Sequence, residues 1–318
     1  MRNKLTSCLT GAVFSLAASG LALAADIGVK GPPAAPPAPV YNWTGFYVGG
    51  NAGVSLGTFK TDFNASGTLV SGLSIPGLNP FASNFAGSGG DDTVYPGGFI
   101  GGGQIGYNWQ LSPLWVVGVE GDFQGADEKE HSNPSVGFRA PVIFIPSGGV
   151  GTGTLTTVNG TTAFDYSAKI EWFGTARVRA GYLFGDGAVF TYVTGGLAYG
   201  KVDVAGTSTL TQSLFGGEVV GPSITQAFNH SNVNTGWVVG SGTEGKLANF
   251  PGWTYRIEGL YMDLGHLDTN GSGGSAVGLI PGLAFFTTTA GPVHTHTHFT
   301  DTILRAGVSY QFSGWPFH

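Results

Sequence analysis

Apolar and polar residues alternate along the end of the chain, over residues 302–312. One face of a strand would hold Thr302, Leu304, Ala306, Val308, Tyr310 and Phe312, and the other Ile303, Arg305, Gly307, Ser309 and Gln311. Successive side chains of a strand point to opposite sides of a sheet. An apolar face that ends in aromatic rings, opposite a face that carries an arginine, is typical of a barrel with lipid outside and a polar interior.

The same two-residue period recurs in seven earlier segments: 43–56, 99–111, 115–124, 168–182, 188–202, 237–246 and 253–261. Each is long enough for a tilted membrane strand, which needs about 10 residues. Segment 188–202 is apolar on both faces, so its phase is assigned from its neighbours. We therefore predict an all-β fold, an eight-stranded antiparallel up-and-down transmembrane β-barrel.

The connections between these segments alternate in length. Residues 111–114, 183–187 and 248–252 are short turns, whereas about 57–98, 125–167, 203–234 and 266–298 are long and rich in Gly, Ser and Thr. Outer-membrane barrels have short periplasmic turns and long extracellular loops. The long ranges are therefore predicted as extracellular loops, and both ends of the barrel segment are predicted on the periplasmic side.

Aromatic residues gather at the two ends of the predicted strands. The periplasmic group is Trp43, Trp109, Trp115, Tyr182, Trp253, Tyr310 and Phe312, and the outer group is Phe123, Trp172, Trp237 and Tyr261. Amphipathic rings favour the headgroup level of a membrane. A soluble glycine-rich sandwich or solenoid is the alternative, but it gives no reason for such belts to coincide with alternating turn lengths.

Composition agrees with a membrane barrel. The chain has 318 residues with 56 Gly, 13% aromatic and only 10% charged residues, whereas soluble domains carry about 25% charge. After the N-terminus no stretch of 18 or more apolar residues occurs, which excludes helical membrane spans.

The N-terminus predicts a secreted protein. Residues 1–24 form a signal peptide, with Arg2 and Lys4 ahead of an apolar core and a small-x-small cleavage site that ends at Ala24. The only cysteine, Cys8, lies inside it. Residues 25–42 are a proline-rich periplasmic linker, 43–312 the barrel and 313–318 a short tail. Cleavage leaves 11 basic and 19 acidic residues, a formal charge of −8, so nucleic acid is not an expected partner.

Nearly all charges of the predicted strands share the lumenal face. They are Glu120, Asp122, Lys169, Glu171, Arg177, Arg179, Glu244, Lys246, Arg256, Glu258 and Arg305. Eight strands leave an interior just wide enough for side chains to fill. The charges therefore predict a salt-bridge plug, and the alternative is a charged eyelet that passes small solutes. No nucleophile stands beside them, so we expect neither an enzyme nor a cofactor.

Four segments resemble a known family: NWTGFYVGGNAGVSLG (42–57), TGGLAYG (194–200), RIEGLYMDLG (256–265) and LRAGVSYQF (304–312). They are similar to small alphaproteobacterial outer-membrane immunogenic proteins, which belong to the OmpA-like and opacity-type eight-stranded barrels. The resemblance implies a structural surface protein, loosely called a porin, and some members are associated with haem. Expected partners are outer-membrane lipid and lipopolysaccharide, and a haem or host surface ligand.

The resemblance extends to the signal that the outer-membrane assembly machinery reads on the last strand. Arg305, Gly307, Tyr310 and Phe312 match it. This chain departs from the family pattern by continuing for six residues, 313–318, after Phe312. We expect the assembly machinery to be a partner of this chain.

Three histidines form the one metal-like pattern. His294, His296 and His298 share a strand face, because alternate residues of a strand point the same way. Imidazole nitrogens are common ligands of transition metals. The alternative is a polar continuation of the last strand. Asp263 and His266, at a strand end, are interpreted as a turn rather than a catalytic pair.

Overall fold

The computed structural model describes residues 41–71, 82–144, 154–214, 218–219, 223–280 and 284–312. They form 12 strands: β1 Gly45–Ser71, β2 Ala82–Val94, β3 Gly97–Gln110, β4 Trp115–Ser132, β5 Ser135–Phe144, β6 Thr154–Phe184, β7 Val189–Leu214, β8 Glu218–Val219, β9 Ile224–Lys246, β10 Trp253–Asn270, β11 Gly274–Ile280 and β12 Ala284–Gln311. No helix in these ranges is long and apolar enough to cross a membrane. The predicted signal peptide, most of the linker and the tail lie outside the described residues.

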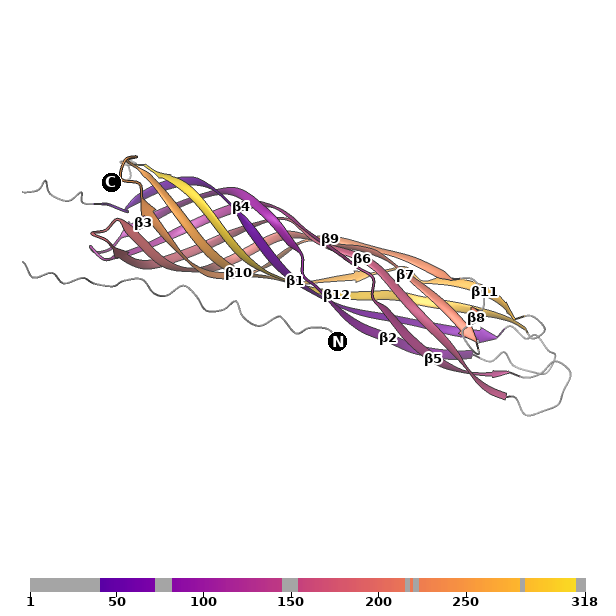
Figure 1. Ribbon diagram of the computed structural model, residues 1–318. Coiled ribbons are helices and arrows are strands. Elements are labelled where there is room, and N and C mark those ends of the chain that lie inside the picture. Colours follow the sequence, from indigo (N-terminus) through magenta and orange to yellow (C-terminus); the bar gives the residue numbers. More distant parts are fainter. Residues whose placement is uncertain are drawn as a thin grey trace, which may run out of the picture. The chain divides into compact units, whose positions relative to one another are not determined.

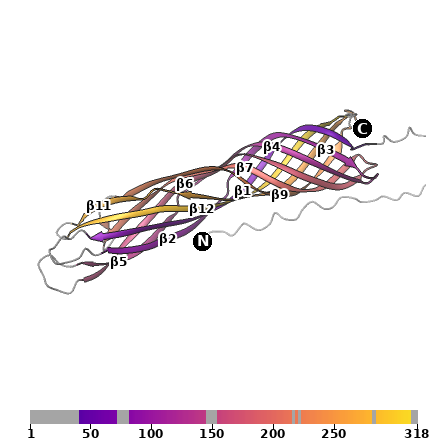
Figure 2. The same cartoon turned by 180° about the vertical axis from the view of Figure 1, so that it is seen from behind.

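Eight of these strands close into an antiparallel ring. The order β1-β3-β4-β6-β7-β9-β10-β12 returns to β1, because β12 also pairs with β1 from Tyr47–Gln311 onward. Figure 1 shows the ring at the end where β3, β4 and β10 are labelled, and Figure 2 shows it from behind. The predicted eight-stranded up-and-down barrel is confirmed.

The outer surface of the ring is apolar. Phe99, Val178, Val193, Leu197 and Leu304 are each more than half exposed on it. Exposed apolar residues around a whole barrel match a lipid environment. Aromatic side chains frame this surface: Trp109, Trp115 and Trp253 below, and Phe123, Trp237 and Tyr261 above. We take the membrane-spanning segments to end at the level of this upper belt, where Tyr261 pairs with Thr302.

Trp43 departs from the predicted belt. It is only 1% exposed, and its indole Nε1 donates a hydrogen bond of 2.7 Å to the carbonyl oxygen of Gly187. The ring packs on Phe190 with centroids 5.5 Å apart. Trp43 shares the strand phase of the inward-facing Tyr47, so it caps the periplasmic end of the lumen from inside instead of facing lipid.

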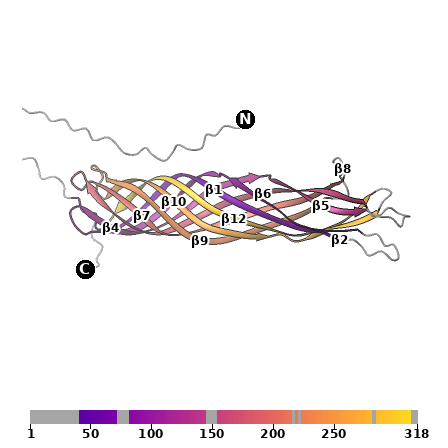
Figure 3. The same cartoon turned by 90° about the horizontal axis from the view of Figure 1, so that it is seen from below.

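The predicted long loops are wrong over much of their length. Seven strands of the ring, all except β3, continue past the upper belt, and β1, for example, runs unbroken from Gly45 to Ser71. Strands β2, β5, β8 and β11 add further pairing there. Figure 3 shows the strands continuing from the ring toward the labels β2, β5 and β8. We call the paired part beyond the upper belt the extension.

In the extension the closed ring gives way to two sheets. The pairing of β9 with β10 ends at Trp237–Asp263, and that of β3 with β4 ends at Ile100–Ala126. Above these points one sheet consists of β2, β1 and β12, with first β10 and then β11 paired to β12. The other consists of β9, β7 and β6, with first β4 and then β5 paired to β6. Phe63 of the first sheet stacks on Phe164 of the second, with centroids 4.4 Å apart. The extension therefore has a hydrophobic core of its own.

Candidate functional site

The lumen of the ring holds a compact group of eight charged side chains, which we call the lumenal cluster. Four arginines face four acids: Arg177, Arg179, Arg256, Arg305, Glu120, Asp122, Glu244 and Glu258. They come from β4, β6, β9, β10 and β12, and every one of these side chains is at most 3% exposed. Formal charges balance within the cluster, as buried charges require.

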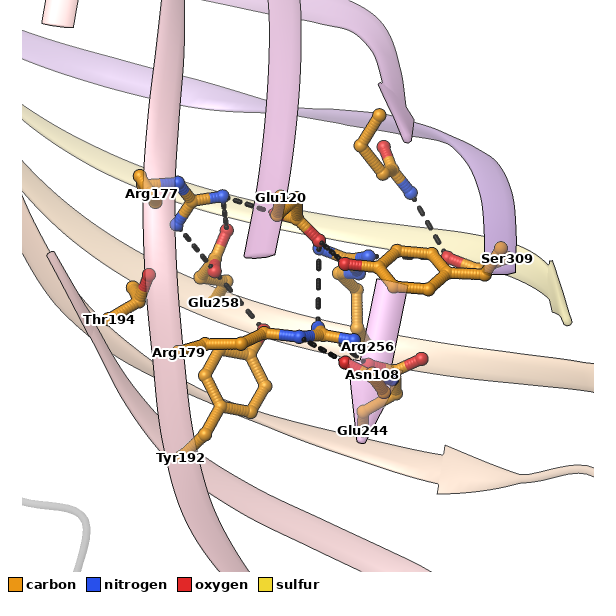
Figure 4. A network of polar contacts seen from close by, with 12 residues as sticks. Asn108, Glu120, Arg177, Arg179, Tyr192, Thr194, Glu244, Arg256, Glu258 and Ser309 are labelled. Carbon is orange, nitrogen blue, oxygen red and sulfur yellow. Dashed lines mark hydrogen bonds and ion pairs between the residues drawn. The ribbon is translucent and has the colours of Figure 1, made fainter. Parts of the chain in front are cut away.

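The ion pairs interlock across the lumen (Figure 4). Arg177 reaches Glu120 at 2.5 Å, Glu258 at 2.8 Å and Asp122 at 3.0 Å. Arg305 reaches Glu258 at 2.6 Å and Asp122 at 2.7 Å. Glu120, Asp122 and Glu258 therefore each join arginines from different strands, so the cluster links opposite walls of the barrel.

Neutral side chains complete the lumenal cluster and close its periplasmic side. The Tyr47 hydroxyl donates to Glu120 at 2.6 Å and the Tyr192 hydroxyl to Glu258 at 3.1 Å. The Arg179 guanidinium lies over the ring of Tyr47 at 4.6 Å, which is cation–π distance. Below them, Trp43, Val116, Leu183, Phe190 and Tyr192 form a buried apolar group. The lumen is thus filled by a charged middle layer above an aromatic cap.

Two of the predicted lumenal charges lie outside the barrel. Lys169 and Glu171 are about one-third exposed and form a 2.5 Å ion pair, and Glu171 also reaches Lys201 at 2.6 Å. The reason is a β-bulge between Ile170 and Trp172. An extra residue in a strand flips every side chain beyond it to the other face.

Lys246 lies at the periplasmic mouth, apart from the lumenal cluster. Its ammonium group contacts the Gln311 side chain and sits 4.5 Å from the centroid of the Trp43 ring. Its hydrogen-bond partners are therefore neutral. It adds to the periplasmic cap rather than to the charged layer.

The residues predicted to signal assembly have separate places on β12. Arg305 belongs to the lumenal cluster, and Gly307 pairs with Asn51 in the barrel wall. Tyr310 packs against Trp253 at 5.5 Å and Phe312 against Phe46 at 5.8 Å, at the periplasmic rim. Recognition by the assembly machinery stays a prediction.

The three predicted metal-binding histidines line up on the outer surface of the extension. His294, His296 and His298 contact side-chain oxygens of Asn270, Asp268 and Asp263 at 2.5, 2.5 and 3.0 Å. The three imidazoles therefore turn to three different oxygens. Within the described ranges no group of three or more His, Cys, Asp or Glu side chains is placed to hold a metal ion. Metal or haem binding by these histidines stays a prediction.

His266 joins this group, although the sequence analysis placed it in a turn. Its ring stacks between those of His296 and His298, with both centroid distances at 4.3 Å. Burial, together with the positive charge that these two neighbours can carry, lowers the pKa of His266. The pairing of β10 with β12 brings His266 next to His296 and His298, and no short-range pattern in the sequence reports that pairing.

A second buried acidic group escaped the sequence analysis. Glu128 on β4 and Asp301 on β12 are each 1% exposed and point inward just above the upper belt. Asp301 interrupts the otherwise apolar inward positions Phe299 and Ile303. A carboxylate among inward apolar positions is the available signal at Asp301, but its partner Glu128 lies in a range that the sequence predicts as a loop.

Comparison with known proteins agrees with this architecture. The family model of the outer membrane protein beta-barrel domain matches residues 21–312. This chain belongs to the outer-membrane β-barrel family. It is located in the bacterial outer membrane, as the membership and the apolar outer surface of the ring both indicate.

Two relatives are named for the same location. The 31 kDa outer-membrane immunogenic protein of Brucella melitensis is 34% identical over 247 residues, which cover 77% of this chain and 81% of the relative. The 22 kDa outer membrane protein of Rhizobium leguminosarum is 28% identical and covers 76% of this chain and 74% of its own length. The predicted resemblance to outer-membrane immunogenic proteins is confirmed.

Among solved structures, the outer membrane protein OprG from Pseudomonas aeruginosa is 14% identical, with a TM-score of 0.28. The alignment covers 85% of this chain and 97% of that one. Similarity at this level supports no comparison of function.

Proposed function

We propose that this protein is a structural surface protein, in which a sealed barrel anchors a rigid extension that presents the chain outside the cell. The observation that carries the proposal is the lumenal cluster. Its eight charged side chains are almost completely buried. A diffusion channel needs a continuous watery path at this level, and an eight-stranded barrel has little room for one.

The extension supports the surface role. From Leu56 to Ser71, β1 alone continues for 15 residues, which is about 50 Å of strand. Paired strands over a packed aromatic core hold their shape, in contrast to free loops. Such a stalk would lift its tip away from the membrane surface, where host ligands or antibodies could reach it.

Conductance of the purified, refolded protein in planar bilayers tests the sealed lumen. We expect no discrete openings from the wild-type barrel. The triple variant Arg177→Ala, Arg305→Ala, Glu258→Ala removes charges of both signs and much side-chain volume, so it is expected to conduct. Discrete wild-type openings would contradict the proposal, and a conducting variant shows that the assay can detect an emptied lumen.

Cysteine labelling on intact cells tests the surface role. The single cysteine lies at position 8, inside the predicted signal peptide, so an introduced cysteine would be unique in the mature chain. A membrane-impermeant maleimide should label Ser275→Cys, exposed on β11, without permeabilisation. The matched control is Asp186→Cys, exposed in the short turn before β7, which should react only after the outer membrane is opened. The reverse pattern would overturn the proposed orientation.

A further inference from the structure

Two carboxyl groups meet inside the chain where the barrel joins the extension. Glu128 and Asp301 interact directly, although they lie on β4 and β12. The Ser55 hydroxyl points to the same place from β1, next to Glu128, and is wholly buried. We call these three residues the neck site. Three separate strands therefore direct oxygen atoms to one buried point.

The polar atoms of the neck site face no positive charge within the described part of the chain. Both carboxylate oxygens of Glu128, both of Asp301 and the Ser55 hydroxyl are buried without a hydrogen bond of normal geometry. Their polar neighbours are one another and the backbone amides of Leu56 and Thr302. The lumenal cluster lies deeper, and its arginines pair with other acids. Leaving a buried polar group unpaired costs about 1–3 kcal/mol, and more for a charged one. Five such atoms at one point call for an occupant.

Two glycines make the space for the carboxyl groups. A Cβ atom on Gly98 would lie 2.8 Å from Cγ of Glu128, and one on Gly57 would lie 3.2 Å from Oε2 of Glu128. Gly57 also pairs directly with Asp301. A Cβ on Gly98 would first meet the backbone carbonyl of Asp127, at 2.4 Å, and one on Gly57 the side chains of Phe59 and Pro96, at 2.9 Å. The wall around the neck site is therefore packed too closely for a side chain at either position.

Three occupants are conceivable on chemical grounds. A proton shared between the carboxyl groups would satisfy one oxygen of each acid, and the Ser55 hydroxyl could donate to Glu128, but one buried negative charge would remain unbalanced. A water molecule would donate two hydrogen bonds but leave the negative charges unbalanced. A divalent cation balances two carboxylates and contacts oxygens of all three residues at once. Ligands that are only oxygen favour a hard cation over zinc or copper.

We propose that the neck site binds one calcium ion between Glu128, Asp301 and Ser55. Calcium takes six to eight oxygen ligands in flexible geometry, so the five side-chain oxygens can form most of its shell, with backbone carbonyls or water as the remainder. The ion joins β1, β4 and β12 just where the ring opens into two sheets. Its role is to hold the base of the extension closed.

The burial of the two carboxyl groups also favours their protonated form. Burial, and then the negative charge of Asp301, raise the pKa of Glu128 to about 8. Burial likewise raises the pKa of Asp301 to about 6, although the nearby backbone amides of Thr302 and Leu56 offset part of the rise.

Calcium titration of the refolded protein in detergent, after removal of metal with a chelator, tests the proposal. We expect one calcium ion per chain by calorimetry and a higher urea midpoint with calcium than with chelator. At 100-fold excess over the dissociation constant the unfolding equilibrium constant should fall about 100-fold. Magnesium, which gives up its water less readily and demands octahedral geometry, should act more weakly.

Substitutions at the neck site test whether its residues bind the ion. The double variant Glu128→Gln, Asp301→Asn keeps the shapes of both side chains and should lose the calcium response while remaining folded. Asp203→Asn removes a carboxylate of the outer surface, near Lys169, and should keep the response. A calcium response that persists in the double variant would place the ion elsewhere. A wild-type protein that binds no calcium, by calorimetry and by terbium luminescence, would overturn the proposal.

Discussion

The barrel and the extension are made by the same strands, yet their faces have opposite polarity. On β1 the barrel part exposes Val48 and Leu56 and buries Asn51, whereas the extension buries Phe59 and exposes Lys60. On β12 the barrel part exposes Leu304 and buries Arg305, whereas the extension buries Phe299. The inward side stays inward, and only the chemistry of the two sides is exchanged.

This exchange follows from the surroundings of each part. In the membrane the outer side meets lipid, so polar groups must gather in the lumen. Above the membrane the outer side meets water, and burial of aromatic residues becomes the main source of stability. The two parts should therefore fail in different ways when one interior side chain is removed.

The largest effect is expected in the barrel, from Arg177→Met. Arg177 contacts Glu120, Asp122 and Glu258, and its removal leaves buried acids without a partner. Breaking a buried ion pair from one side costs about 3–5 kcal/mol. Urea unfolding of the refolded barrel measures it. The control Lys169→Met breaks an ion pair on the outer surface and should leave the midpoint unchanged. Equal effects of the two variants would contradict a special contribution of the lumenal cluster to the stability of the barrel.

A loss of stability of similar size, but confined to the extension, is expected from Phe63→Ala. Phe63 stacks on Phe164 and meets Tyr166 edge-on at 5.1 Å. Replacing a buried phenylalanine by alanine costs about 3–5 kcal/mol. Hydrogen exchange should show faster opening of the extension while the barrel amides stay protected. Asn64→Ala, on the outer side of the same strand, is the control, and loss of protection throughout the barrel would show that the two parts unfold as one.

The exchange of polarity also explains why the barrel strands, but not the extension, could be predicted from the sequence. The barrel strands were predictable because one apolar face continues for about 10 residues. At Gly57 the apolar residues of β1 move from even to odd positions although the strand itself continues. That change of phase looks like the end of a strand, so the extension was assigned to loops. Lys169 and Glu171 were misplaced for a related reason, since a bulge leaves no mark in the alternation itself.

A smaller effect is expected from Tyr166→Phe, which tests the link between the two sheets. The buried Tyr166 hydroxyl on β6 donates a 3.0 Å hydrogen bond to Asp92 on β2. Burial raises the pKa of Tyr166, so the hydroxyl remains a donor at any working pH. Loss of one such bond costs about 1 kcal/mol, seen as faster exchange in the extension only. If exchange is unchanged, solvent replaces the bond and the sheets are held by packing alone.

The smallest effect is a pH dependence confined to the extension. The pKa of His266 is lowered by burial first and then by His298 and His296, while Asp263 and Asp268 oppose the shift. The unfolded chain, with a histidine pKa of about 6.5, therefore binds more protons than the folded one as the pH falls. The contribution of His266 to stability should therefore be present above about pH 6.5 and lost below it. The neck-site acids act in the opposite direction, because their raised pKa values favour the folded state at low pH.

His266→Gln should remove this contribution. The urea midpoint of the extension, followed by pulse proteolysis between pH 5.5 and 7.5, should rise in the variant relative to the wild type as the pH is lowered. His230→Gln is the matched control, since His230 is exposed on β9 and should leave the slope as it is. If both variants keep the wild-type change of midpoint with pH, that change arises from other groups of the extension. The neck-site acids would then be substituted next. The barrel, whose lumenal charges are paired and sealed, should show no such slope in this range.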